Sequence, residues 1–456
     1  MLDMLSFLQC ITCVDSTTLR RLAVIVSAML AMTGRVTMLG ISRWTEEGGS
    51  YRTIQRFFNT DIKWDKLHWE LVKHAFLDLQ DVYIVAGDEV VITKAGSETH
   101  GLGKFYSSIM GKVVPSLSYF TFSLVSTTTA ASYPLMTRQQ LPPEPEKNTP
   151  TEVPVTPKRG RGRPKGSKNK NKSEVVLSPY WIFIQGMLSS LLLIIGIDVR
   201  YIVLDGAFGN QYAYHMIKKC GSQLHLISKM KVNSAFYFPF SGTYSGRGPH
   251  CKYGDKFNPY HIPVCYLKES SISDGIRTDI YQMQLLHTLF PQPLNIVLIR
   301  KTQLEKGLSS HVILFSSDLE LTYDLLIYYY RLRFQIEFNF RDAKQFWGLE
   351  DFMTVNETPV TNAANLAFFM VNVAQALVHS FRQQNDKFST NDLKAHFRGL
   401  KYATEVLKLL PEKPDPILMT QILTQLTSLG RLIPLSWRRY CCSLVISADN
   451  SPLKPK

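Results

Sequence analysis

The sequence predicts an α/β fold with helical regions on both sides of the sheet-forming part. Three observations lead to this prediction. Residues 1 to about 80 show helical spacing of apolar side chains, with capping residues before them. From residue 81 the pattern changes to apolar strands separated by turns and an intervening helix, which is typical of an α/β sheet. From about residue 321 the helical spacing returns and continues through residue 410.

Residues 1–80 carry the pattern of several short helices. Ser16 and Thr17 offer N-caps for the apolar run that follows them. A later helix is predicted after a glycine pair, and it carries Arg52 and Arg56 on one face. A helix-turn-helix DNA-binding domain and a plain helical bundle both produce this pattern. We interpret the region as a DNA-end-binding domain.

Residues 81–230 predict the first part of the sheet. Its strands are the apolar runs YIVAGDEVVI, KVVPSLSYFTFSLV, YIVLD and LHLISKM, and a helix is predicted near residues 210–220. Asp88 ends the strand segment YIVAGD, and Asp205 ends YIVLD. A carboxylate at the end of a buried strand is poorly hydrated unless a positive group faces it. Each aspartate is therefore either a functional acid or a residue that caps a turn.

One segment of this region, residues 180–197, is apolar enough to raise the question of a membrane span. It includes Gln185, Gly186, Ser189 and Ser190, so we expect a buried helix and no membrane partner. The N-terminal residues MLDMLSFLQC lack the basic region and cleavage site of a signal peptide. The seven cysteines are scattered without zinc-like pairing, which favours reduced thiols in an intracellular protein.

Three further regions complete the predicted organisation. Residues 231–320 contain glycines and short β-like runs, and they predict a β-rich insertion into the sheet-forming domain. Residues 321–380 predict a helical region that completes this domain and begins with one long helix from about 321 to 347. Residues 381–456 predict a C-terminal helical region.

Residues 138–178 are rich in Pro, Lys, Gly and Asn and predict a disordered insert. Its centre, KRGRGRPKGSKNKNK at 158–172, has eight basic residues and no acid. The chain has a net charge of +14, so +6 remains without this run, and a nucleic acid is the natural partner. Arg161, Arg163 and Pro164 resemble the core of an AT-hook, whose arginines enter the minor groove of A·T-rich DNA. A polycationic linker that contacts phosphates without sequence preference is the alternative.

A third acidic residue lies in the helix predicted from 321 to 347. In YRLRFQIEFNFRDAK, the residues Tyr330, Arg333, Glu337 and Lys344 fall within a sector of about 60° when each residue turns the helix by about 100°. They therefore share one helix face. A solvated, salt-bridged face would carry the same charges.

These four residues match the signature Y-x2-R-x3-E-x6-K at every position. On them the chain resembles the DDE transposases of the insertion-sequence-four-like group of bacterial mobile elements. The segments GDEVVITKAGSETHGLGKFYSSIMGK and YIVLDGAFGN look like the first and second aspartate regions of that group. The order Asp, Asp, β-rich insertion, Glu also agrees, so the resemblance covers roughly residues 80–380.

The resemblance implies a ribonuclease H-like core, a mixed five-stranded sheet with flanking helices. Asp88 would lie on the first strand, Asp205 on the fourth and Glu337 on a later helix. The three carboxylates would hold two Mg²⁺ ions, or Mn²⁺ as a substitute, and catalyse DNA cleavage and strand transfer. Hard oxygen ligands with open coordination positions suit such ions and such chemistry.

The resemblance also implies partners and surroundings for this site. Tyr330, Arg333 and Lys344 would contact phosphates beside the scissile bond. The DNA partners would be the element ends and the target, and the pairing of two ends implies at least a homodimer. The place of action would be the cytoplasm of a prokaryotic cell, at the nucleoid. Asp342 and Glu350 fit no motif position, and we expect them to be surface charges.

One departure concerns cleavage through a DNA hairpin. Relatives that cut in this way stack a flipped base on a tryptophan of the β insertion. None of the six tryptophans in this sequence lies in residues 231–320. Another aromatic ring can take this place, because any aromatic face can stack on a base. The candidates are Phe236, Tyr237, Phe238 and Tyr244.

Two other functions stay open on the sequence alone. A non-catalytic DNA-binding or architectural protein on a degenerate nuclease scaffold would need only the AT-hook and the helical domain. A hydrolytic nuclease would use the same three carboxylates but would yield no strand-transfer products. The presence of all three acids and of the complete Tyr-Arg-Glu-Lys face argues against the first of these.

Overall fold

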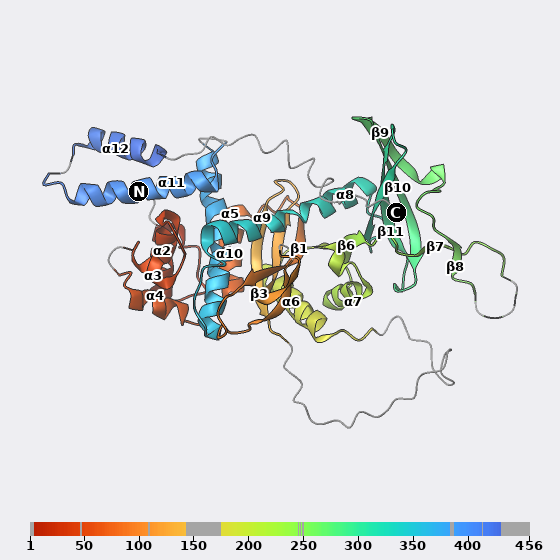
Figure 1. Ribbon diagram of the computed structural model, residues 1–456, viewed down its shortest axis with the longest axis horizontal. Helices are drawn as coiled ribbons and strands as arrows, with labels where there is room; N and C mark the ends of the chain where they lie inside the picture. The colour runs from red at the N-terminus through yellow and green to blue at the C-terminus, as the bar shows by residue number, and fades with distance from the viewer. Residues whose placement is uncertain are drawn as a thin grey trace, which may run out of the picture.

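A 12-stranded sheet runs through the molecule and is covered by helices, so the fold is mixed α/β, as the sequence predicts (Figure 1). The computed structural model describes residues 4–429, apart from 46–47, 108–109, 143–174, 245, 247, 249, 384–386 and 413. The predicted disordered insert and AT-hook therefore lie mostly outside the described residues. The domain limits proposed from the sequence stay predictions.

Five neighbouring strands form the centre of the sheet, in the order β4-β3-β1-β5-β6. β3 is antiparallel to β1 and β4, whereas β1, β5 and β6 are parallel to one another. The short β2 pairs with the beginning of β3. The bounds of these strands are β1 Tyr83–Thr93, β2 Gly103–Ser107, β3 Lys112–Ser126, β4 Ser132–Gln140, β5 Tyr201–Leu204 and β6 His225–Met230.

The strands predicted after residue 231 continue this sheet. β12 pairs with β6, and β11, β10, β7 and β8 follow in space, while β9 pairs with the other part of β10. They lie at the end of the molecule opposite the N-terminal helices (Figure 1). Their bounds are β7 Phe236–Pro239, β8 Tyr253–Lys256, β9 Leu267–Ser273, β10 Ile276–His287, β11 Leu294–Gln303 and β12 Ser309–Ser316.

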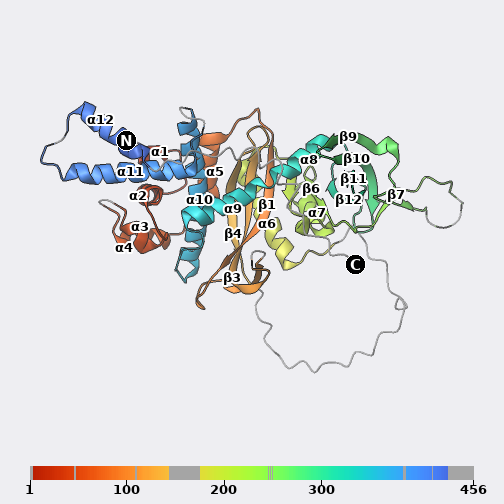
Figure 2. The same cartoon turned by 45° about the horizontal axis from the view of Figure 1, so that its top comes forward.

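Helices cover both faces of the sheet, which explains why β3 is buried almost along its whole length. α6 and α7 pack on one face together with Phe122, Leu204 and Leu226. The other face packs against α8, α9 and α10, and α9 contacts β1 and β4 (Figure 2). The bounds are α5 Trp64–Phe76, α6 Pro179–Ile195, α7 Gln211–Cys220, α8 Tyr323–Leu332, α9 Gln335–Trp347 and α10 Glu357–Arg382.

Among the described residues, α10 alone has the length and hydropathy that a membrane-spanning helix needs. Most of its apolar window, 78%, is buried inside the protein. α6, the apolar segment singled out in the sequence, buries one face through Trp181, Ile184 and Met187 and leaves Leu193 exposed. Both helices thus pack as core helices of this fold.

The N-terminal helices form a layer beyond α10 (Figure 1). They are α1 Met4–Phe7, α2 Ser16–Ala31, α3 Met38–Ser42 and α4 Tyr51–Phe58. The N-cap of α2 is Asp15, which accepts from the backbone N–H of Thr17 and Thr18, so the prediction of Ser16 or Thr17 as the cap is wrong. A carboxylate one residue upstream can accept both of these donors, whereas one hydroxyl inside the first turn cannot.

The helix predicted from 321 to 347 is two helices, α8 and α9, with Arg333 and Phe334 between them. Both residues keep right-handed helical dihedral angles. The hydrogen bonds at the junction join residues three apart, from the N–H of Phe334 to Arg331 O and from the N–H of Glu337 to Phe334 O. Such a 3₁₀ step leaves the spacing of apolar residues almost unchanged, so periodicity does not reveal it. α11 Thr390–Lys408 and α12 Pro416–Ser428 complete the described chain.

Candidate active site

Asp88 lies inside β1, at the point where one of its two neighbours ends. The parallel pairing of β1 with β5 stops at Gly87 opposite Leu204, while the antiparallel pairing with β3 continues to Thr93. The sequence predicted that the strand ends at Asp88, and this prediction is wrong, because β1 extends to Thr93. β1 continues because β3 still supplies hydrogen bonds on its other edge. A Cβ on Gly87 would lie 2.8 Å from the side chain of Phe122 and 2.9 Å from that of Leu204, so any larger residue here would force these side chains to shift.

Asp205 is the residue that follows β5, and it starts the 3₁₀ helix Gly206–Phe208 without capping it through its side chain. Because Gly87 and Leu204 are the last pair of the parallel ladder, Asp88 and Asp205 come next on adjacent strands. The side chain of Asp205 is 41% exposed, whereas that of Asp88 is 18% exposed. The two aspartates thus lie at the same end of the parallel strands β1 and β5.

The third acid, Glu337, enters from the first turn of α9. α9 packs on β1 and β4, and the ion pairs of Arg333 with Asp88 and Glu337 place its first turn beside the end of the β1–β5 ladder. The guanidinium of Arg333 joins all three carboxylates. Its Nη1 lies 3.0 Å from Asp88 Oδ2, and its Nη2 lies 3.0 Å from Glu337 Oε1 and 3.6 Å from Asp205 Oδ1.

These ion pairs gather residues that are far apart in the sequence around one buried cation. The Arg333 side chain is 11% exposed. The three acids offer the oxygen donors that hard divalent cations prefer, so the donor set fits such an ion. In the described part of the chain, no three His, Cys, Asp or Glu side chains are already arranged to hold a metal ion. The carboxylates are instead arranged around the guanidinium.

Burial and charge both act on the ionisation of this cluster. Burial raises the pKa of Asp88 to about 6, although Arg333 and the backbone N–H of Glu89 act in the opposite direction. The Glu89 N–H donates to Asp88 Oδ1 at 2.8 Å. Burial by itself would lower the pKa of Arg333, but Asp88, Asp205 and other negative neighbours outweigh it and leave that pKa raised. The cluster is therefore held by mutual charge around two largely buried side chains, those of Asp88 and Arg333.

Tyr330 belongs to the same cluster, whereas Lys344 does not. The Arg333 Cζ lies 5.9 Å from the centre of the Tyr330 ring, and burial raises the pKa of Tyr330 to about 12. Lys344 donates to the carbonyl of Val91 at 3.1 Å and pairs with Glu350 at 2.9 Å. The shared helix face predicted from the sequence thus brings three of its four residues together.

Two residues beside Asp88 were not singled out from the sequence. Glu89, the next residue on β1, accepts hydrogen bonds from the hydroxyls of Ser118 and Tyr180, at 2.5 and 3.1 Å. Burial and the negative charge of Glu89 raise the pKa of Tyr180. The signal was present, since an acid follows Asp88 directly and Tyr180 begins the apolar segment that was judged only for membrane insertion.

The remaining predicted residues have different surroundings. Arg161, Arg163 and Pro164 lie outside the described residues. Glu350 is a surface charge that pairs with Lys344. Asp342 is not simply a surface charge, because its side chain is only 20% exposed, it pairs with Arg341, and burial raises its pKa. α9 lies between the sheet and α10, so more of its circumference is covered than its charge pattern suggests.

In the insertion, the four aromatic candidates differ in their exposure. Phe236 is fully buried, and Tyr237 and Phe238 are partly buried in aromatic contacts with Tyr253 and Phe257. Tyr244 is 47% exposed, and its ring stacks on His250 with the ring centres 3.9 Å apart. Of the four, Tyr244 is therefore the most exposed.

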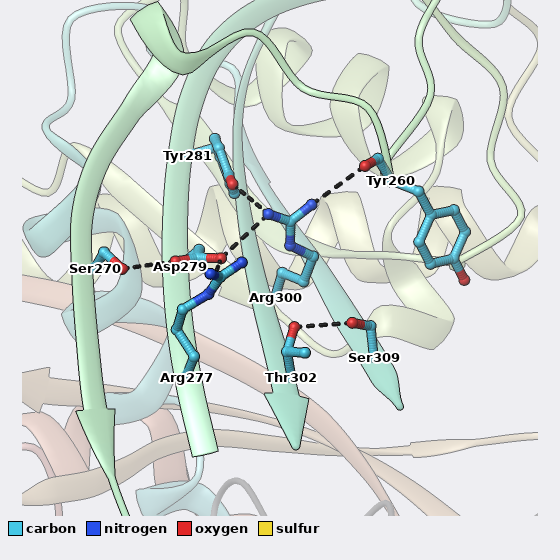
Figure 3. Close-up of polar contacts among 8 residues, drawn as sticks. All are labelled: Tyr260, Ser270, Arg277, Asp279, Tyr281, Arg300, Thr302 and Ser309. Carbon is cyan, nitrogen blue, oxygen red and sulfur yellow. Dashed lines mark hydrogen bonds and ion pairs between the residues drawn. The ribbon is translucent and has the colours of Figure 1, made fainter. Parts of the chain in front are cut away.

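A polar network on β9–β12 braces the outer half of the insertion (Figure 3). Asp279 is buried and accepts from Ser270 at 2.7 Å and from Arg300 at 3.1 Å, and Arg277 lies 3.2 Å away. Arg300 also donates to the hydroxyl of Tyr281 and, at 3.4 Å, to the carbonyl of Tyr260. These contacts tie neighbouring strands together through one buried acid, so the network is a structural one.

Comparison with known proteins identifies the family of this chain. A family model described as "DDE superfamily endonuclease" matches residues 6–279, a stretch that includes Asp88 and Asp205 but ends before Glu337. No curated protein matches the sequence. A solved structure, the cryo-EM structure of a piggyBac transposase synaptic complex with hairpin DNA, aligns with 93% of this chain and 77% of that chain. Its sequence identity is 9% and its TM-score is 0.39, which carries no argument about fold or function. Because the family model covers more than half of the sequence, the chain belongs to the DDE superfamily endonucleases.

Proposed function

We propose that the protein is a transposase that cuts the ends of a mobile DNA element by metal-dependent phosphoryl transfer and joins them to target DNA. The observation that carries the proposal is the meeting of Asp88, Asp205 and Glu337 around one guanidinium. Family membership supports DNA as the substrate, because the family is one of endonucleases. The catalytic core would be ribonuclease H-like.

The order of the central strands supports this core. Without the short β2, the chain forms β1, β3, β4, β5 and β6, so Asp88 is on the first of five central strands and Asp205 follows the fourth. Tyr330, Arg333 and Glu337 also lie together, which supports the insertion-sequence-four-like subgroup. Lys344 departs from this cluster, and its contact with DNA is the least supported part of the assignment.

Enzymes of this superfamily generally use divalent metal ions, and Asp88, Asp205 and Glu337 would hold two Mg²⁺ or Mn²⁺ ions here. When bound, such ions activate the attacking water or 3′-hydroxyl and stabilise the leaving oxygen of an in-line displacement at phosphorus. The ladder between β1 and β5 fixes Asp88 and Asp205 relative to each other, and α9 brings Glu337 to them. Tyr330 and Arg333 lie beside these acids, where they can contact the phosphate that reacts.

The N-terminal helices supply a surface that fits the element end. α4 buries Ile54 and Phe57 and turns Arg52, Gln55 and Arg56 to solvent. Arginine and glutamine are side chains that read base edges in the major groove. A recognition helix held by its apolar side is the arrangement that such reading requires. The basic run at 158–172 would add phosphate contacts by tethering, without a role in the chemistry.

A hydrolytic nuclease without strand transfer is the second candidate, favoured by the family's description as endonucleases. Both candidates need the same three acids, so the difference lies in the products. Joining of two ends also requires two active sites, which is why the transposase would act as at least a homodimer.

The test uses purified protein and DNA carrying the inverted ends found beside the gene, with Mg²⁺ or Mn²⁺. We expect the wild type to cut these ends and to form strand-transfer products with a target plasmid. Asp88→Asn and Glu337→Gln should bind the DNA but yield neither product. Asp342→Asn is the matched control on α9 and should stay active. Cleavage without joined products would support the nuclease, and cleavage by both acid variants would refute the site.

A further inference from the structure

Arg333 is the shared counter-ion of all three acids, and this inference builds on the function proposed above. Asp88, Asp205 and Glu337 all form an ion pair with this one guanidinium. Three formal negative charges thus face one positive charge, and two members of the cluster, Asp88 and Arg333, are largely buried. Like charges this close resist ionisation unless a cation lies between them. Arg333 is the side chain that supplies it in the protein alone.

The position of the guanidinium conflicts with that of a metal ion. A divalent cation needs direct contact with the carboxylate oxygens that now point at Arg333. In the described residues, no group of three acidic, histidine or cysteine side chains is ready to hold an ion. Loading the site therefore requires the oxygens to exchange their guanidinium contacts for metal contacts.

The backbone at Arg333 is suited to such an exchange. Arg333 stands between α8 and α9, where the N–H of Ile336 and that of Glu337 bond to residues three positions earlier. A 3₁₀ step in mid-helix has weaker hydrogen-bond geometry and often marks a hinge. The arginine side chain can therefore leave the carboxylates without disturbing the regular turns of either helix.

We propose that Arg333 is a positioning residue that holds the three acids together before metal binding and yields its place between them to the divalent cation. Once released, the guanidinium is free for the DNA phosphate that reacts beside it. Arg333 keeps the three acids assembled, but the metal ion must displace it. The wild-type protein therefore binds the ion less tightly than a protein without the guanidinium would. Removing the guanidinium must then strengthen metal binding, whereas removing any true metal-assisting group would weaken it.

The first test is calorimetric titration of Mn²⁺ into the full-length protein without DNA. We expect Arg333→Gln to bind Mn²⁺ about tenfold more tightly than the wild type, within the usual range of such couplings. Arg333→Lys, which keeps the charge but loses the fork, should lie between the two. The same variants should unfold at a lower temperature than the wild type without metal. Mn²⁺ should raise their unfolding temperature by more than it raises that of the wild type.

Arg300→Gln is the matched control. Arg300 is equally buried, with a side chain 14% exposed, pairs with Asp279 at 3.1 Å and lies 5.1 Å from the Tyr281 ring. It differs from Arg333 in lying on β11, in the polar network of Figure 3, and it pairs with none of the three acids. Its loss should lower the unfolding temperature and leave the affinity for Mn²⁺ unchanged. A tenfold change in this variant as well would overturn the inference, because the effect would then be one of general stability.

A second test uses the wild type and needs no variant to fold. Phenylglyoxal modifies accessible guanidinium groups, and mass spectrometry locates them. Arg333 should be protected without metal and labelled several times faster with Mn²⁺, while the exposed Arg341 is labelled equally in both. Continued protection of Arg333 with Mn²⁺ bound would overturn the inference.

Asp88→Asn separates this inference from the function on which it depends. If Asp88→Asn weakens Mn²⁺ binding but Arg333→Gln binds it no better than the wild type, the role of Arg333 is wrong and the metal site stands. If Mn²⁺ binding does not depend on Asp88, the proposed function fails together with the inference.

Discussion

The Lys344 ammonium donates a 3.1 Å hydrogen bond to the carbonyl of Val91, three residues beyond Asp88 on the same strand. Glu337, seven residues before Lys344 on α9, reaches Arg333 instead. Seven helical residues and three strand residues both span about 10 Å. α9 therefore runs alongside β1, with the three acids near one end of this contact and Lys344 near the other.

Lys344→Gln should leave the metal site intact and weaken DNA binding. The lysine lies too far along α9 to pair with the carboxylates, but one lost phosphate contact lowers the slope of log affinity against log salt by about 0.9. Titrations of Mn²⁺ and of DNA at several salt concentrations measure the two effects. Lys94→Gln is the control, since Lys94 also holds the loop after α9, by donating to the carbonyls of Glu350 and Phe352. A loss of Mn²⁺ affinity in Lys344→Gln alone would contradict this placement.

Arg52→Ala and Arg56→Ala should each reduce the preference for element-end DNA by about 1–3 kcal/mol, because each removes a base contact of α4. Stability should hardly change, since both side chains are exposed. The measurement is the ratio of affinities for end DNA and for unrelated DNA of equal length. Arg20→Ala, on the exposed side of α2, should leave this ratio unchanged. Equal losses for both DNAs would show that α4 only contacts phosphates.

Replacing the eight basic residues of 158–172 by glutamine should flatten the salt dependence of DNA binding. The cleavage rate at saturating DNA should stay the same, because the run takes no part in the chemistry. Binding isotherms at increasing salt, together with single-turnover cleavage, test both statements. An unchanged salt slope would be the opposite result. A loss of preference for A·T-rich DNA would specifically support the AT-hook.

His68 should make the protein sensitive to acid. It is fully buried between α5 and α10, its Nδ1 lies 3.0 Å from Asn372 Nδ2, and burial lowers its pKa to about 3. Its pKa in the unfolded chain is about 6.5, so the unfolded state takes up a proton first and stability falls as the pH drops below about 6.5. Between pH 7.5 and pH 5 the loss from this group is about 2 kcal/mol.

Urea unfolding of the wild type and of His68→Gln at both pH values measures this loss. The variant should lose about 2 kcal/mol less than the wild type over the same interval, whatever its stability at pH 7.5. Equal losses would mean that the pKa of His68 is the same in the folded and the unfolded protein, which would contradict this account.

The sequence predicted the two aspartates of the site better than the arginine at its centre. Asp88 and Asp205 were each noticed as the acid at the end of an apolar run, and only the family resemblance placed them in one site. Glu337 was predicted from its helix face, which shows the direction of a side chain but not its position along the helix axis. For the same reason the sequence placed Lys344 too close to the three acids. The central position of Arg333 depends on ion pairs with Asp88 and Asp205, which are 245 and 128 residues earlier in the chain. No local pattern reports such contacts.

Other differences also come from long-range packing. β1 continues past Asp88 because β3 pairs with it, and Asp342 is only 20% exposed on a helix that packs against both the sheet and α10. The break at Arg333 changes hydrogen bonds while keeping helical dihedral angles, so the apolar spacing on both sides still reads as one helix.

The central claim is that residues 88, 205 and 337 hold divalent ions as one unit. Electron paramagnetic resonance of Mn²⁺ bound to the protein on element-end DNA tests it most directly. We expect two bound ions in the wild type and a loss of at least one in each of Asp88→Asn, Asp205→Asn and Glu337→Gln. Two ions bound with unchanged affinity in all three variants would contradict the claim.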